Sequence, residues 1–135
     1  MRRVVIESPY AGDVEKNIEY AKRAVRDSIC RGEAPIASHL LLAAHGICND
    51  DVAYERAVGI DAGLAWHSAA DVIAFYIDLG MSPGMEAAQK HAVENGYSGK
   101  IVFRALFSEN YADAVYLAKE ENVFDLATSG MRGME

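Results

Sequence analysis

The sequence has few cysteines, few prolines and no long apolar run. Its 135 residues contain two cysteines, Cys30 and Cys48, which are too few for a disulfide framework and too isolated for a zinc knuckle. No apolar run approaches the roughly 20 residues that span a bilayer, and the N-terminus lacks the apolar core of a signal peptide. These absences predict a cytoplasmic protein with reduced thiols, no metal site and no membrane partner.

Basic residues are also scarce. Thirteen Lys and Arg stand against 20 Asp and Glu, which gives a formal net charge of −7. Binding of a nucleic-acid polymer depends on many cations, so this balance argues against such a partner and leaves room only for a local cationic spot that binds one nucleotide. Hydrophobic residues make up 51% of the chain, too many for a disordered tail. A single globular domain over residues 1–135 is therefore expected.

Short β-branched runs alternate with helical patterns along the chain. Strands are predicted at residues 4–6, 35–38, 72–77 and 101–103. Helices are predicted at residues 13–32, 53–66, 82–96 and 110–120, with Asp13 and Ser82 as N-caps. This order predicts a small α/β domain with a parallel sheet and right-handed crossovers.

The helix at residues 53–66 carries two glycines, Gly59 and Gly63. Each weakens a helix by roughly 1 kcal/mol relative to Ala, so a close backbone contact is expected there. The residues predicted on its inner side are Ala53, Ala57, Ile60 and Leu64. His67 and His91 are predicted to lie on the surface.

Ligands of open parallel sheets bind at the carboxyl ends of the strands. Three segments are expected to meet there, at residues 8–13, 38–39 and 78–86. The expected ligand-binding residues in them are Ser8, Pro9, Gly12, His39, Ser82, Gly84 and Met85. His39 contacts a phosphate or a base in this interpretation; the alternative is a hydrogen-bonded structural histidine.

The segment Ser82-Pro83-Gly84-Met85 opens a helix. Its free N–H groups and the positive end of the helix dipole would attract an anion, and Gly84 would let a phosphate approach the backbone. The alternative is that Ser82 and Pro83 only cap the helix while Glu86 offsets its dipole. Motif specificity alone favours the capping interpretation.

A set of short motifs occurs in a fixed order along the chain, namely Ser8-Pro9-Tyr10, Asn17, the stretch at 35–41, Glu55-Arg56, Gly59, Gly63, Trp66, Asp71, Asp78 and Gly84-Met85-Glu86. In these motifs the chain resembles the nucleoside 2-deoxyribosyltransferase-like superfamily, and in particular a branch of small relatives, over about residues 3–104. The resemblance implies a flavodoxin-like or Rossmann-like sheet of four to five strands, flanked by helices, with residues 105–135 as an extension. It also implies a homo-oligomer and no cofactor.

The resemblance also implies catalytic roles. Glu86 corresponds to the nucleophile that attacks the sugar C1′, and Ser82 and Gly84 correspond to phosphate or sugar contacts. Tyr10 would border the base or orient the carboxylate, and Asp78 would protonate the leaving base or hold a ribose hydroxyl. The transferases usually continue Glu-Leu-Gly-x-Ala after the nucleophile, whereas Ala87 and Ala88 follow Glu86 here.

The sequence therefore leaves two main hypotheses for the function. One is N-glycosidic bond cleavage or deoxyribosyl transfer on a nucleoside or nucleotide, as in a nucleoside deoxyribosyltransferase or a nucleoside-monophosphate N-glycosidase. The other is a non-catalytic protein that sequesters or senses a nucleotide, including cyclic or ADP-ribose-type signals. A scaffolding role is the third alternative.

Overall fold

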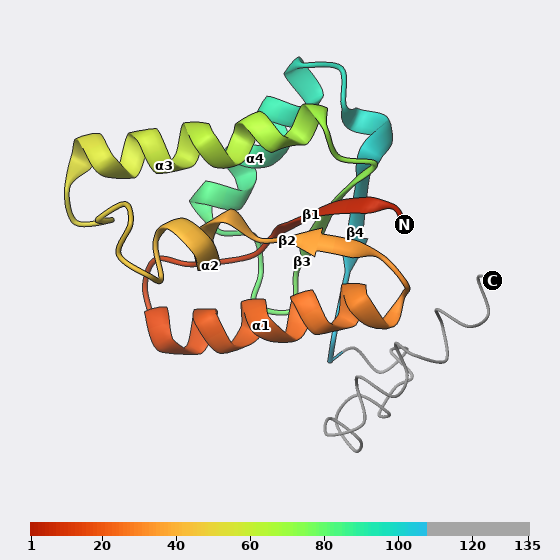
Figure 1. The fold of residues 1–135 in the computed structure, drawn as a ribbon, viewed down its shortest axis with the longest axis horizontal. Coiled ribbons are helices and arrows are strands. Elements are labelled where there is room, and N and C mark those ends of the chain that lie inside the picture. The colour runs from red at the N-terminus through yellow and green to blue at the C-terminus, as the bar shows by residue number, and fades with distance from the viewer. Residues whose placement is uncertain (108–135) are drawn as a thin grey trace.

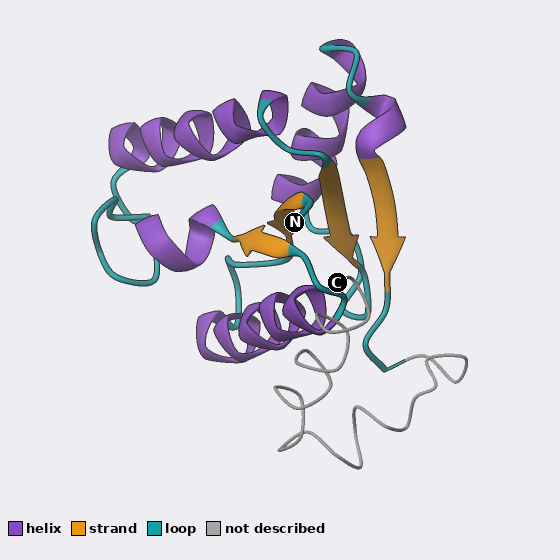
Figure 2. Cartoon of the chain, turned by 45° about the vertical axis from the view of Figure 1, so that its right-hand side comes forward, coloured by secondary structure: helices purple, strands orange, loops and turns teal. Residues whose placement is uncertain are grey.

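A parallel sheet of four strands forms the centre of the computed structural model, which describes residues 1–107. The strands, β1 (Arg3–Glu7), β2 (Ala34–Ile36), β3 (Val72–Tyr76) and β4 (Ile101–Arg104), lie in the order β2-β1-β3-β4. Figure 2 shows β3 and β4 side by side and running in the same direction. This arrangement confirms the predicted α/β class, and the strand order is that of a small flavodoxin-like or Rossmann-like sheet.

The two central strands are in register at their carboxyl ends. Val4 pairs with Val72 at one end of the β1–β3 ladder, and Glu7 pairs with Phe75 at the other. In a sheet of this order the direction of winding reverses between β1 and β3, which is where flavodoxin-like folds bind ligands. The loops that follow β1 and β3 therefore start next to each other.

Helices cover both faces of the sheet (Figure 1). Helix α1 (Val14–Cys30) lies on one face, and α3 (Ala53–Ala65) and α4 (Pro83–Glu94) lie on the other. Shorter elements are α2 (Ser38–Leu42) and the 3₁₀ turns at Trp66–Ser68 and Ser98–Lys100. Asp13 and Ser82 cap α1 and α4 through their side chains, as predicted.

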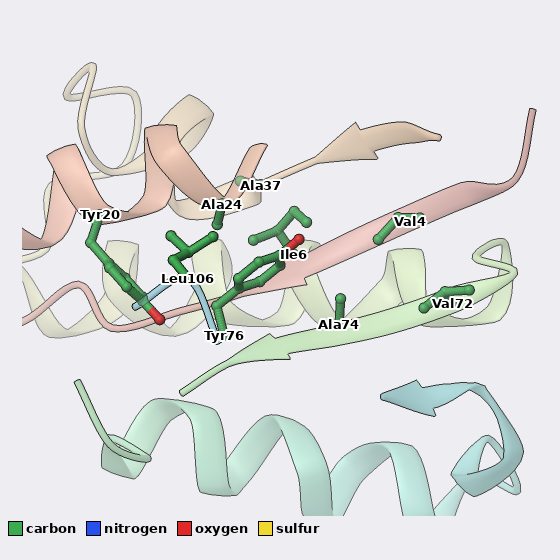
Figure 3. Packing of buried hydrophobic residues seen from close by; sticks show 9 residues of the cluster. All are labelled: Val4, Ile6, Tyr20, Ala24, Ala37, Val72, Ala74, Tyr76 and Leu106. Atoms are coloured by element: carbon green, nitrogen blue, oxygen red, sulfur yellow. The ribbon is translucent and has the colours of Figure 1, made fainter. Parts of the chain in front are cut away.

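Alternating side chains of β1 and β3 divide the core into two clusters. Val4 and Ile6 face α1, whereas Val5 faces α4. Figure 3 shows the α1-side cluster, which consists of Val4, Ile6, Tyr20, Ala24, Ala37, Val72, Ala74, Tyr76 and Leu106. Burying a side chain such as Ile6 contributes roughly 1.5–3 kcal/mol to folding. By the same alternation, Glu7 faces the α3–α4 side.

Two sequence predictions about local structure are wrong. The predicted strand at residues 35–38 ends at Ile36 in the structure, because Ala37 is the extended residue that precedes α2. On α3, Leu64 packs on the core as predicted, but Ala53 and Ala57 are exposed, Ile60 is half-exposed, and the buried position is Gly63. Gly63 allows close approach of Ser38 on α2, and Gly59 lies against Cys48 in the loop between α2 and α3.

His67 is also misplaced by the sequence prediction, because it is fully buried. It lies four residues after the buried Gly63, on the same side of the helix, and its imidazole contacts Glu7 and His91. Within residues 1–107 no helix has the length and apolar content needed to cross a bilayer. The predicted helix at residues 110–120 lies outside the described residues.

Candidate functional site

A cavity of about 230 Å³ opens at the carboxyl ends of β1 and β3. Its walls come from the loop after β1, the start of α2, the loop before α3, the middle of α3 and the first turns of α4. All three segments that the sequence predicts at this edge contribute residues to it. The cavity therefore lies where the winding of the sheet reverses, which is the usual ligand position in such folds.

Ser8 and His39 form a hydrogen bond inside this cavity. Ser8 Oγ lies 2.7 Å from His39 Nε2, and the Ser8 residue is only 7% exposed. Burial lowers the pKa of His39, while the negative charge of Glu7 acts in the opposite direction. The imidazole is therefore neutral at pH 7 and accepts the Ser8 proton when its own proton is on Nδ1.

Glu7 is the last residue of β1 and places a carboxylate in the cavity wall. Its Oε1 lies 2.9 Å from Nε2 of the buried His67, and its side chain is 17% exposed. His67 Nδ1 in turn lies 3.3 Å from His91 Nδ1. These contacts fix the orientation of the Glu7 carboxylate. The sequence analysis did not identify Glu7 as a site residue, although its position before Ser8 at a strand end is a usable signal.

The first turn of α4 forms the wall that follows β3. Ser82 Oγ accepts a hydrogen bond from the Met85 N–H at 3.2 Å, and Pro83 occupies the first turn of the helix. A Cβ atom built on Gly84 would meet only Ser82 Oγ, at 3.9 Å, so the space in front of this backbone is open. The positive end of the α4 dipole therefore faces accessible space.

Arg56 on α3 supplies a cation to the same cavity. Its Nε lies 3.8 Å from Asp50 Oδ1, and its side chain is half-exposed. The loop that carries Asp50 is held by Glu55, whose carboxylate accepts the Asn49 N–H at 3.2 Å. An exposed ion pair of this kind is weak, so Arg56 can exchange Asp50 for a ligand anion.

Tyr10 borders the cavity from the loop after β1. Asn17 on α1 holds this loop, because its Nδ2 donates to the carbonyl oxygens of Tyr10 and Ala11 at 2.9 and 3.1 Å. Burial and the charges of Asp50 and Asp51 raise the pKa of the Tyr10 hydroxyl, which keeps it a neutral donor at pH 7. The aromatic ring and the hydroxyl are both available to a ligand.

Several predicted site residues lie together in the cavity wall and others do not. Those that line it are Ser8, Tyr10, His39, Ser82, Gly84 and Met85. Those that are not part of its lining are Pro9, Gly12, Asp78 and Glu86. Glu86 is exposed on α4. Met85 and Ala88 face the sheet, and Glu86, which directly follows Met85, points about 100° away from it around the helix axis.

Asp78 lies on the α1 side of the sheet, where its carboxylate accepts three hydrogen bonds. The donors are the Tyr20 hydroxyl at 2.6 Å and the N–H groups of Leu106 and Phe107, each at 2.7 Å. These bonds occupy both carboxylate oxygens. Asp78 therefore connects α1 with the segment after β4.

Comparison with known proteins gives one match. The family model described as a domain of unknown function, DUF7768, matches residues 2–102, which include every described wall of the cavity. No curated protein and no solved structure matches the chain. Because the family model covers most of the sequence, the chain belongs to the DUF7768 family.

Proposed function

We propose that this protein binds a nucleoside or nucleotide in the cavity at the carboxyl ends of β1 and β3. The observation that carries the proposal is the meeting of the α4 N-terminus, the Arg56 guanidinium and the Tyr10 ring in one cavity. An anionic group is stabilised at a helix N-terminus and by arginine, and an aromatic ring suits a planar base. The resemblance to nucleoside-processing proteins points to the same ligand class.

The cavity offers a distinct environment for each part of such a ligand. The phosphate would lie at Gly84 and Arg56, and the base would lie against Tyr10. The Glu7 carboxylate and the Ser8 hydroxyl would accept hydrogen bonds from sugar hydroxyls. At about 230 Å³ the cavity is near the lower limit of ligand pockets, which favours a single nucleotide over a dinucleotide.

Binding without cleavage of the N-glycosidic bond is the form of the proposal that the geometry supports best. A nucleophilic carboxylate has to reach the anomeric carbon, and the exposed Glu86 is not part of the cavity lining. Removing its charge should leave ligand affinity unchanged. The Glu86→Gln variant therefore separates the binding hypothesis from the cleavage hypothesis.

The test is a panel of nucleosides, nucleoside monophosphates and dinucleotides, with thermal unfolding and chromatography run on the same samples. We expect at least one mononucleotide to raise Tm, because a ligand of the folded state alone stabilises it, and to be recovered with its N-glycosidic bond intact. Arg56→Ala should weaken binding about tenfold. Lys22→Ala is the matched control, since Lys22 is an exposed cation paired with Glu19 on α1. No Tm shift with any member, or equal losses in both variants, would refute the proposal.

A further inference from the structure

We propose that Ser8 and His39 form a nucleophile–base pair that cleaves phosphoesters bound in the cavity. This inference goes beyond ligand binding and assigns an activity to two residues that the proposed function uses only as contacts. It rests on the geometry of the pair and on the polarity of the wall opposite. It does not depend on whether the ligand carries a nucleobase.

The first support is the contact itself. A serine hydroxyl is a weak nucleophile unless a base within hydrogen-bond distance takes its proton, and Ser8 Oγ lies 2.7 Å from His39 Nε2. The two residues come from separate segments, the loop after β1 and the start of α2, and both line the cavity. A bound ligand is therefore within reach of the hydroxyl.

The second support is the charge environment of the base. Burial keeps His39 neutral, so its Nε2 can accept a proton, and the nearby Glu7 carboxylate favours the imidazolium that then forms. Glu7 itself is held in place by its 2.9 Å contact with His67. In serine hydrolases a carboxylate stabilises the imidazolium through a hydrogen bond, and here Glu7 acts on His39 through its negative charge.

The positive charge around the cavity favours phosphoesters as substrates. The cavity wall formed by α4 presents N–H groups and the positive end of the helix dipole, and Arg56 adds a cation. Charge develops on the non-bridging oxygens when a phosphoryl group is transferred, and donors of this kind stabilise it. A neutral acyl ester would gain less from the Arg56 charge.

The reaction balances in two steps. Ser8 Oγ forms a bond to phosphorus while His39 takes the hydroxyl proton, the bond to the leaving alcohol breaks, and His39 returns the proton to that oxygen. Water then attacks phosphorus while His39 takes one of its protons, the P–Oγ bond breaks, and His39 returns that proton to Ser8 Oγ. The net products are the alcohol and the phosphate.

The test labels the full-length protein with an alkyl fluorophosphonate, which transfers its phosphonyl group to an activated serine oxygen and releases fluoride. Intact-mass analysis and peptide mapping should find one adduct, on Ser8. His39→Gln should slow labelling about 100-fold, the scale of a lost general base. Ser98→Ala, which changes a serine outside the cavity lining, should not alter the rate.

A second measurement tests the substrate class with p-nitrophenyl phosphate and p-nitrophenyl acetate. We expect turnover of the phosphate that is lost in Ser8→Ala. No adduct on Ser8 of the wild-type protein, labelling unchanged in folded His39→Gln, or turnover of the acetate alone would each overturn the proposal. If Ser8→Ala does not fold, peptide mapping of the wild-type adduct still shows whether Ser8 is the labelled residue. Labelling of Ser8 together with a failed nucleotide panel would refute the proposed function and leave this inference standing.

Discussion

The Tyr20 hydroxyl donates a hydrogen bond of 2.6 Å to Asp78 Oδ2 and accepts one of 2.9 Å from the Asp78 N–H. This reciprocal pair ties the middle of α1 to the residue that follows β3. It also explains why Asp78, an acidic residue at a strand end, stabilises the fold on the α1 side instead of facing the cavity.

Tyr20→Phe should lower the free energy of unfolding by about 1–3 kcal/mol and leave ligand affinity unchanged. The variant removes the Tyr20 hydroxyl that donates to the half-buried Asp78 carboxylate and accepts from the Asp78 N–H. Urea denaturation measures the loss. Tyr54→Phe is the control, since Tyr54 is 77% exposed on α3. If Tyr20→Phe weakened ligand binding without changing the free energy of unfolding, Asp78 would have a role in ligand binding and not in stability.

Gly63→Ala should destabilise the packing of α3 on α2 by roughly 1–3 kcal/mol. A Cβ atom at Gly63 would lie 2.5 Å from Ser38 Oγ and 3.2 Å from Ser38 Cβ, so the Ser38 hydroxyl would have to rotate away and its Cβ would have to shift. Both residues line the cavity, and ligand affinity should therefore fall as well. Gly99→Ala is the control, because a Cβ atom there meets nothing within 4 Å. Equal stability of the two variants would contradict the close contact.

Glu33→Gln should cost roughly 3 kcal/mol, because it leaves the Arg104 guanidinium in a buried position without its anion. Arg104 Nη1 and Nη2 donate to the two Glu33 oxygens at 2.8 and 2.9 Å, and these side chains are 9% and 7% exposed. Burial alone would raise the pKa of Glu33, but the hydrogen bonds from Arg104 and Ser28 lower it below its ordinary value.

The lowered pKa of Glu33 fixes the sign of its pH dependence. Its contribution to stability is complete above the ordinary glutamate pKa and is lost as the pH falls through the lower pKa of the folded state. Acid titration of unfolding free energy should therefore show a steeper loss in the wild-type protein than in Glu33→Gln. Parallel curves for the two proteins would contradict this assignment.

His39 gives a second pH dependence, near neutrality. Because burial lowers its pKa in the folded state, the unfolded chain binds the proton first, and stability should fall as the pH drops from the ordinary histidine range toward the folded pKa. His39→Gln should remove this part of the loss, measured as the difference in unfolding free energy between about pH 8 and about pH 5. An unchanged difference would show that His39 is not held neutral by burial.

Much of the fold could be predicted from patterns of residues that are close in the sequence. The apolar run of β3, the Asp13 and Ser82 caps, and the order of strands and helices follow from residues that are close in sequence. The meeting of the loops after β1 and β3 follows from parallel topology. These features need no knowledge of distant contacts.

The roles of Glu7, Glu86 and His67 could not be predicted in the same way. The burial of His67 and the orientation of the Glu7 carboxylate come from one contact between residues that lie 60 positions apart in the sequence. Glu86 takes its outward direction from the neighbours that pack on the sheet. Each role depends on tertiary contacts that spacing alone does not contain.

The proposed ligand site is the cavity between β1, α3 and α4. Amide chemical-shift mapping of the full-length protein during titration with nucleoside 5′-monophosphates tests it most directly. We expect saturable shifts that are concentrated at residues 8–11 and 82–86 and are reduced in Arg56→Ala. Absent shifts, or shifts concentrated on the outer face of α1, would contradict it.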